Sequence, residues 1–194
     1  MDKDFLLKTY GQCYGPEAGP WNLSVENKYL EYMFTKFFEN NFSINEGYQI
    51  CNIGIGAGYW DRYLSYKLKN GRLTSIDIDE ICCKQLLEGL TNEDNKNPIE
   101  IINSDIMMTR GLEGKFDIVT MVGSSRLESG LYHEILNKAI SLIKTGGSMY
   151  YQTLERTEDM NEFIKVCVAN RVKIDNYLID MEYGLKAQYW KIIK

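Results

Sequence analysis

The chain has few of the residues that build metal sites or disulfide frameworks. Of its 194 residues, one is histidine (His133), three are proline and five are cysteine. No two cysteines form a C-x-x-C pair, so we predict no zinc site and no other bound metal. The cysteine count is odd and Cys82 adjoins Cys83. Reduced thiols, and hence a cytoplasmic protein, are the simplest interpretation.

Long apolar runs and excess positive charge are also missing. No stretch approaches the roughly 20 apolar residues of a membrane span. We expect no secretory signal, because in the first residues (Met-Asp-Lys-Asp) no basic region precedes an apolar stretch. The net charge of −5 argues against a broad nucleic-acid surface. We therefore expect neither a membrane nor a nucleic acid as partner.

The most informative segment is 50–58, Ile-Cys-Asn-Ile-Gly-Ile-Gly-Ala-Gly. An apolar run leads into Gly54, Gly56 and Gly58, and a helical pattern follows at once. Glycine lets a backbone turn tightly and approach a ligand, and the N–H groups of the helix start then face that ligand. The dinucleotide fingerprint G-x-G-x-x-G would need a sixth-position glycine, where this chain has Tyr59. The pattern is G-x-G-x-G instead, and a purely structural turn is the alternative interpretation.

A carboxylate stands at the end of the next predicted strand, 72–77. Asp77 follows the glycines by about twenty residues, the distance at which an acidic residue can accept the hydroxyl hydrogens of a ribose. The competing role is a helix N-cap. We predict the ribose role for Asp77 and the cap role for Asp79.

Strands and helices alternate along most of the chain. We predict strands at 48–54, 72–77, 99–103, 116–122 and 147–153, with helices at 58–69, 79–90 and 131–144 between them and Gly146 as a helix C-cap. Repeated units of this kind imply an α/β fold with a parallel sheet and helices on both faces. A helix at about 158–169 and two strands, about 172–181 and 185–193, follow. Their short connection makes the last two strands antiparallel neighbours.

The N-terminal part differs in composition. Residues 14–20 carry two of the prolines and read as a loop. Ser24 is a predicted cap of a helix whose apolar positions run from Tyr29 to Phe38. We expect one domain, in which 1–45 form an N-terminal helical cap or lid and 46–194 form the cofactor-binding core.

Taken in order, these segments resemble the class I methyltransferases that use S-adenosylmethionine (SAM) and release S-adenosylhomocysteine (SAH). The resemblance covers about residues 45–194 and implies a Rossmann-like seven-stranded, mostly parallel sheet with an antiparallel last strand. It matches Gly54, Gly56 and Gly58 to the loop under the methionine part of SAM, and Asp77 to the ribose. Asp105, after the third strand, matches the residue that accepts from the adenine amino group, although a turn or cap role is the alternative. The full set of implied cofactor-binding residues is Asn52, Gly54, Gly56, Gly58, Asp77, Ile78, Asp105, Ile106 and Val122.

The chain departs from the family pattern at one position. The family usually has Asp or Glu two residues before the first glycine, where this chain has Asn52. An amide can still orient the loop, but it lacks the negative charge that would favour the cationic cofactor. The chain also bears weak similarities to the isoaspartyl and small precorrin methyltransferases, which do not identify a branch.

Residues for catalysis are predicted from their place beyond the carboxyl ends of strands, where open parallel sheets bind ligands. A base near neutrality could be His133, Glu128 or Glu155, with a solvated surface role as the alternative for each. Predicted contacts to the acceptor are Tyr14, Trp21, Ser124 and Arg126.

The leading functional hypothesis is SAM-dependent methyl transfer to an O, N or C nucleophile of a small molecule. The alternatives are a protein or RNA methyltransferase and a non-catalytic SAM-binding partner subunit, while an NAD-linked oxidoreductase fits the glycine spacing least well. The sequence leaves the oligomeric state open between a monomer and a homodimer.

Overall fold

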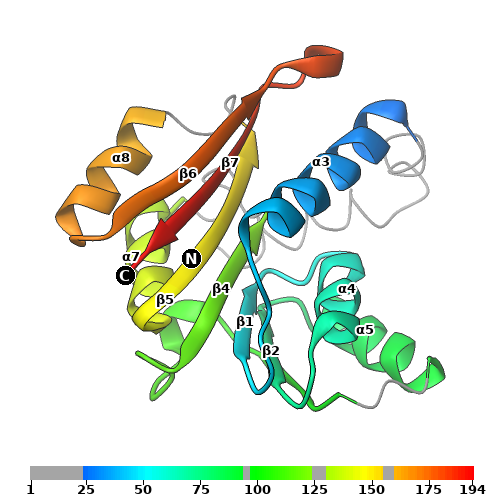
Figure 1. Cartoon of the computed structure of the whole chain (residues 1–194). Helices are drawn as coiled ribbons and strands as arrows, with labels where there is room; N and C mark the ends of the chain where they lie inside the picture. Colours follow the sequence, from blue (N-terminus) through cyan, green and yellow to red (C-terminus); the bar gives the residue numbers. More distant parts are fainter. Residues whose placement is uncertain (1–23, 94–96, 124–129, 155–159) are drawn as a thin grey trace.

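The structure is a computed structural model that describes residues 24–93, 97–123, 130–154 and 160–194. Seven strands form one sheet, and helices precede or connect them (Figure 1). In chain order the elements are α3 (Val25–Asn41), β1 (Gln49–Ile53), α4 (Tyr59–Lys67), β2 (Arg72–Asp77), α5 (Glu80–Asn92), β3 (Ile99–Asn103), the short 3₁₀ helix η2 (Ile106–Met108), β4 (Phe116–Val122), α7 (Tyr132–Leu142), β5 (Ile143–Leu154), α8 (Met160–Ala169), β6 (Lys173–Asp180), the 3₁₀ turn η3 (Glu182–Gly184) and β7 (Ala187–Ile193).

The strand order in the sheet is β3-β2-β1-β4-β5-β7-β6. The pairs among β1 to β5 are parallel, and β7 runs antiparallel to both β5 and β6. This confirms the predicted Rossmann-like sheet and its antiparallel closing strands. The chain builds outward from β1 to β3 and then returns to place β4 on the other side of β1.

Each face of the sheet has its own apolar core. On one face α3 and α4 cover alternate residues of the central strands, such as Ile50 of β1 and Ile118 of β4, and α5 packs beside them. On the other face α7 and α8 cover the intervening residues, such as Cys51 and Val119. Figure 1 shows the two groups of helices on opposite sides of the sheet. Alternation of side chains along buried strands produces this division.

Two predicted helix caps are confirmed. The Ser24 hydroxyl accepts from the Asn27 N–H at 3.2 Å at the start of α3, and Asp79 Oδ1 accepts from the Ile81 N–H at 2.8 Å at the start of α5. Each side chain satisfies one N–H group that the first turn of a helix leaves without an intrahelical partner.

The predicted C-cap at Gly146 is wrong. Helix α7 ends at Leu142, and β5 already begins at Ile143, paired with Phe116. Gly146 lies inside that strand with φ +78°, and its N–H donates to the Lys194 carbonyl at 2.8 Å. The positive φ therefore serves an irregularity of the strand, which is also where the pairing with β4 changes register.

The predicted division into a cap (1–45) and a core (46–194) stays a prediction, because residues 1–23 lie outside the described part. Within that part, α3 packs on the sheet through Phe37, which stacks on Tyr150 with ring centroids 5.7 Å apart. None of the described helices is long and apolar enough to cross a bilayer. The described residues also contain no cluster of three or more metal-ligating side chains, and the four described cysteines are buried and unbridged.

Candidate functional site

The candidate site lies at the carboxyl ends of the parallel strands. The order of the sheet reverses between β1 and β4, because β2 and β3 extend the sheet on one side of β1 and β4 begins the other side. In open α/β sheets, ligands bind in the crevice at such a switch point. The glycine segment leaves β1 at this position and leads directly into α4.

The glycine loop, which we define as residues 54–58, has left-handed backbone at every glycine. The φ values are +85° at Gly54, +55° at Gly56 and +75° at Gly58. A Cβ on Gly58 would lie 3.3 Å from the Leu86 side chain of α5. Glycine is therefore needed for the path of the loop and for its packing on α5.

The Asp77 carboxylate holds this loop against the end of β2. Oδ2 accepts from the N–H groups of Ile55 at 2.7 Å and Gly56 at 3.3 Å, and Oδ1 accepts from the Asp79 N–H at 2.9 Å. Burial raises the pKa of Asp77, and these backbone N–H groups oppose the rise. A carboxylate has about four lone-pair sites, so acceptance from ribose hydroxyls is compatible with these bonds.

Asp105 lies at the exit of β3 and caps η2. Its Oδ1 accepts from the Met107 N–H at 2.8 Å, so the cap role is observed and the adenine role stays a proposal. Ile106, next along, is buried among the apolar residues under α7. Asn103 fixes the neighbouring exit of β2, since its amide donates to the carbonyls of Asp77 at 3.2 Å and Ile78 at 3.1 Å.

A buried polar network lies behind the glycine loop, on the α4 side of the sheet. The Asn52 amide donates to the Gly54 carbonyl and to Asp61 Oδ1, both at 2.9 Å. The Thr120 hydroxyl donates to Asn52 Oδ1 at 2.7 Å and accepts from Trp60 Nε1 at 3.1 Å. Asn52, Asp61 and Thr120 are fully buried. The network connects β1, α4 and β4 directly beneath the loop.

Sequence reasoning missed Asp61, Trp60 and Thr120. Asp61 did leave a signal, because it shares helical spacing with Leu64, Ser65 and Leu68, all of which are buried. A carboxylate on the inward stripe of a helix needs a polar partner, and here Asn52 is that partner.

Several predicted residues cannot be placed. Those that lie outside the described residues are Tyr14, Trp21, Ser124, Arg126, Glu128 and Glu155. His133 is exposed in the first turn of α7, and the centroid of its ring lies 5.3 Å from that of the Tyr132 ring. Val122 ends β4 and is half-buried beside the α4 core.

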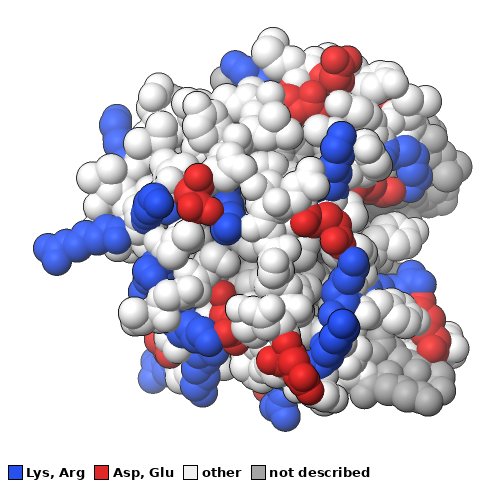
Figure 2. Space-filling model, viewed as in Figure 1, with Lys and Arg blue, Asp and Glu red and all other residues white. Residues whose placement is uncertain are grey.

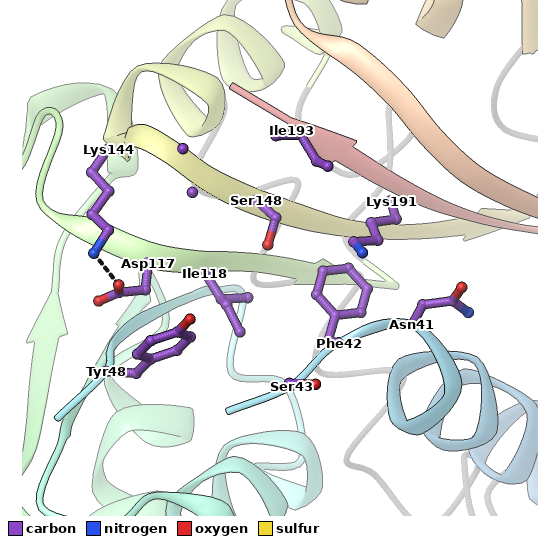
Figure 3. A pocket seen from close by; sticks show the side chains of 12 residues that line it. Asn41, Phe42, Ser43, Tyr48, Asp117, Ile118, Lys144, Ser148, Lys191 and Ile193 are labelled. Atoms are coloured by element: carbon purple, nitrogen blue, oxygen red, sulfur yellow. Dashed lines mark ion pairs between the residues drawn. The ribbon is translucent and has the colours of Figure 1, made fainter. Parts of the chain in front are cut away.

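A hollow of about 420 Å³ lies at the opposite end of the sheet (Figure 3). Asp117 and Lys144, near the amino ends of β4 and β5, form an ion pair at its edge. Asp117 also accepts from the Gln49 N–H at 2.8 Å, and Lys191 pairs with Asp175 at 2.9 Å. Internal ion pairs thus neutralise the charges of this hollow, which lies at the opposite end of the strands from the glycine loop.

Positive and negative side chains alternate over the face of the molecule seen in Figure 2. That view contains no broad basic area, which agrees with the net charge of −5. The fold and the glycine loop together define an α/β protein of the Rossmann-like class, in which ligands bind at the switch point of the sheet.

Comparison with known proteins gives the family. A family model described as "Methyltransferase domain" matches residues 50–147, from β1 to the start of β5. The chain belongs to this family of methyltransferases, whose cofactor is SAM. The match includes the glycine loop, Asp77 and Asp105.

A candidate methyltransferase of Invertebrate iridescent virus 6, 235L, is 25% identical over 181 residues, which are 86% of this chain and 64% of the viral protein. The ribosomal protein L11 methyltransferase of Dictyoglomus thermophilum is 23% identical over 89% of this chain and 50% of its own length. The chain therefore spans about half to two thirds of the length of these curated relatives.

Solved structures share the fold at low identity. The N-methyltransferase NodS of Bradyrhizobium japonicum, in complex with SAH, has a TM-score of 0.75 at 10% identity, with 98% of each chain covered. The 1,6-didemethyltoxoflavin-N1-methyltransferase of Burkholderia thailandensis has a TM-score of 0.73 at 13% identity, over 98% of this chain and 88% of that one. These likenesses confirm the predicted fold.

Proposed function

We propose that this chain binds SAM over the carboxyl ends of β1, β2 and β3 and transfers its methyl group to a small-molecule acceptor. The observation that carries the proposal is the glycine loop tied by Asp77. Three left-handed glycines bring the backbone to the switch point, and one carboxylate fixes that backbone against the next strand. In this proposal the loop lies under the methionine part of SAM.

The other cofactor contacts follow from the strand ends. Asp77 accepts from the ribose hydroxyls, and Asp105 accepts from the adenine amino group with the carboxylate oxygen that does not cap η2. The side chains of Ile78, Ile106 and Val122 give apolar contact, and Asn52 orients the loop from behind. The left-handed glycines and the carboxylates at the ends of β2 and β3 support this proposal, because a nucleoside needs close approach of the backbone and hydrogen-bond acceptors.

When bound, SAM supplies an activated methyl group on a sulfonium. The chain then has to align the acceptor with that methyl group and exclude competing water. The transfer needs no covalent intermediate with the protein. A base that removes the acceptor's proton is drawn from His133, Glu128 and Glu155, and the acceptor contacts are Tyr14, Trp21, Ser124 and Arg126.

A small-molecule acceptor is supported by the Burkholderia thailandensis neighbour, which is named for methylation of 1,6-didemethyltoxoflavin, and by the mixed charge of the face seen in Figure 2. Protein methylation is the second candidate, because one curated relative is named for ribosomal protein L11. The fold alone does not require methyl transfer, since another structural neighbour with a TM-score of 0.71 is the [4+2]-cyclase SpnF.

Calorimetric titration with SAH, and with NAD as the control ligand, tests cofactor binding. Gly56→Arg and Asp77→Asn should abolish or strongly weaken SAH binding. Gly114→Arg is the matched control, because Gly114 also has a left-handed backbone (φ +69°) but precedes β4, away from the loop. The proposal is supported if SAH binds to the wild type and to Gly114→Arg but not to the two loop variants. It is contradicted if the wild type binds NAD or binds neither ligand. Methyl transfer from radiolabelled SAM to a panel of small molecules and to ribosomal proteins then separates the acceptors.

A further inference from the structure

The Asp61 carboxyl faces the back of the glycine loop. Its Oδ1 lies 2.9 Å from the Asn52 amide nitrogen, and the same nitrogen lies 2.9 Å from the Gly54 carbonyl oxygen. One amide therefore links the carboxyl to the first residue of the loop. The Thr120 hydroxyl holds the other end of that amide at 2.7 Å, so the amide cannot rotate away without losing three bonds.

This carboxyl is buried without a positive partner. Asp61 is 0% exposed, and no ion pair among the described residues includes it. Its Oδ2 and the facing Ser75 Oγ have no hydrogen-bond partner in the described structure. Arg62, the adjacent residue, forms an ion pair with Glu93 instead. A buried carboxylate in this state is costly, and a cation that binds nearby relieves the cost.

We propose that Asp61 is a positioning residue that supplies negative charge behind the loop and so makes the site prefer cationic SAM over its neutral product SAH. The inference rests on the proposed function, because it needs SAM in the glycine loop. SAM carries a sulfonium, and SAH has a neutral thioether in its place. A negative charge behind the loop therefore acts on one ligand of the pair and hardly on the other, which favours release of the product.

Asp77 does not fill this role as well. Its carboxylate already accepts three backbone N–H groups, whose positive dipoles offset its charge. Asp61 accepts from one neutral amide and leaves its second oxygen without a partner.

The ionisation of Asp61 is also open to influence from a ligand. Burial raises the pKa of Asp61 to about 7, while the hydrogen bond from the Asn52 amide favours the charged form. The ionisable groups that act electrostatically on Asp61 are Asp77 from β2, Cys51 from β1 and Cys83 from α5, and none of them is cationic. The positive charge of a bound sulfonium would therefore favour the ionised carboxylate.

The test compares the dissociation constants of SAM and SAH by calorimetry at about pH 8. Asp61→Asn should weaken the binding of SAM by about tenfold and the binding of SAH by less than about threefold. A tenfold change is the order expected for loss of one charge at an intermediate dielectric constant. The double variant Asn52→Asp/Asp61→Asn exchanges the two partners and returns a carboxyl to the pair, so it should restore most of the preference for SAM. Asp117→Asn removes a buried carboxyl at the opposite end of the sheet and should leave the SAM-to-SAH ratio unchanged.

Equal losses for SAM and SAH in Asp61→Asn would mean that Asp61 only supports the loop, and unchanged affinities would mean that it has no role in binding; either result overturns the proposal. Thermal unfolding checks that each variant is folded. If Asp61→Asn does not fold, the test rests on the double variant Asn52→Asp/Asp61→Asn. If that variant is folded and no longer prefers SAM, the inference is wrong, because the variant still has a carboxyl group at this pair of positions. If the wild type binds neither ligand, the proposed function itself is wrong.

Discussion

The Thr120 hydroxyl connects two partners that are buried beneath the loop, and its removal should be unusually costly for an isosteric change. In Thr120→Val, Asn52 Oδ1 loses its donor and Trp60 Nε1 loses its acceptor. A buried polar group without a partner costs about 1–3 kcal/mol, so two of them should lower the free energy of unfolding by about 2–6 kcal/mol. The loss should appear as a lower midpoint in urea with an unchanged slope.

Thr120→Ser is the matched control. It keeps the hydroxyl and removes one buried methyl group, which should cost about 1 kcal/mol. The contribution of the hydrogen bonds is therefore the difference between the two variants plus the cost of that methyl group. If Thr120→Val and Thr120→Ser differ by less than about 0.5 kcal/mol, the network does not stabilise the fold in the way its geometry indicates.

Three further outcomes are expected. Asp77→Ala should lower the free energy of unfolding by about 3 kcal/mol in urea titration, because three backbone N–H groups lose their acceptor, and a loss below about 1 kcal/mol would contradict this. Relative to Asp61→Asn, the wild type should lose up to about 4 kcal/mol of unfolding free energy as the pH rises from about 4 to about 7, because the native chain keeps the Asp61 proton to a higher pH than the unfolded chain does. If the unfolding free energies of the two proteins have parallel pH profiles, the pKa of Asp61 is not raised in the native chain. Gly71→Ala places a Cβ 2.3 Å from the Tyr48 carbonyl oxygen and should lower the thermal midpoint far more than Gly114→Ala, which has open space and only the cost of its positive φ.

The sheet could be predicted because its strands are short apolar runs separated by helical patterns. The predicted strand at 72–77 has the same bounds as β2, and the order of elements is as expected. The error at Gly146 has a specific cause: glycine after an apolar helix is typical of a C-cap, but here the chain passes into β5 before that glycine. Local pattern could not show that the Gly146 N–H has a partner at Lys194, far along the chain.

The candidate site was predictable in its backbone and less so in its charges. From Asn52 alone, the sequence indicates a loop with no acidic group behind it. The structure shows that a carboxyl is present, contributed by Asp61 of α4 instead of β1. Residues nine positions apart become hydrogen-bond partners only once α4 packs on the sheet, so a pattern read along the strand alone does not contain this information.

The position of β7 has a consequence for how the sheet is assembled. This strand lies between β5 and β6 although it follows both in the chain. During synthesis β6 therefore leaves the ribosome with no neighbour in the sheet, and the free edge of β5 stays open until β7 arrives. Unpaired edges are where nascent chains associate wrongly. Variants that weaken β7 should therefore lower the yield of folded protein more than they lower the stability of the protein once it is folded.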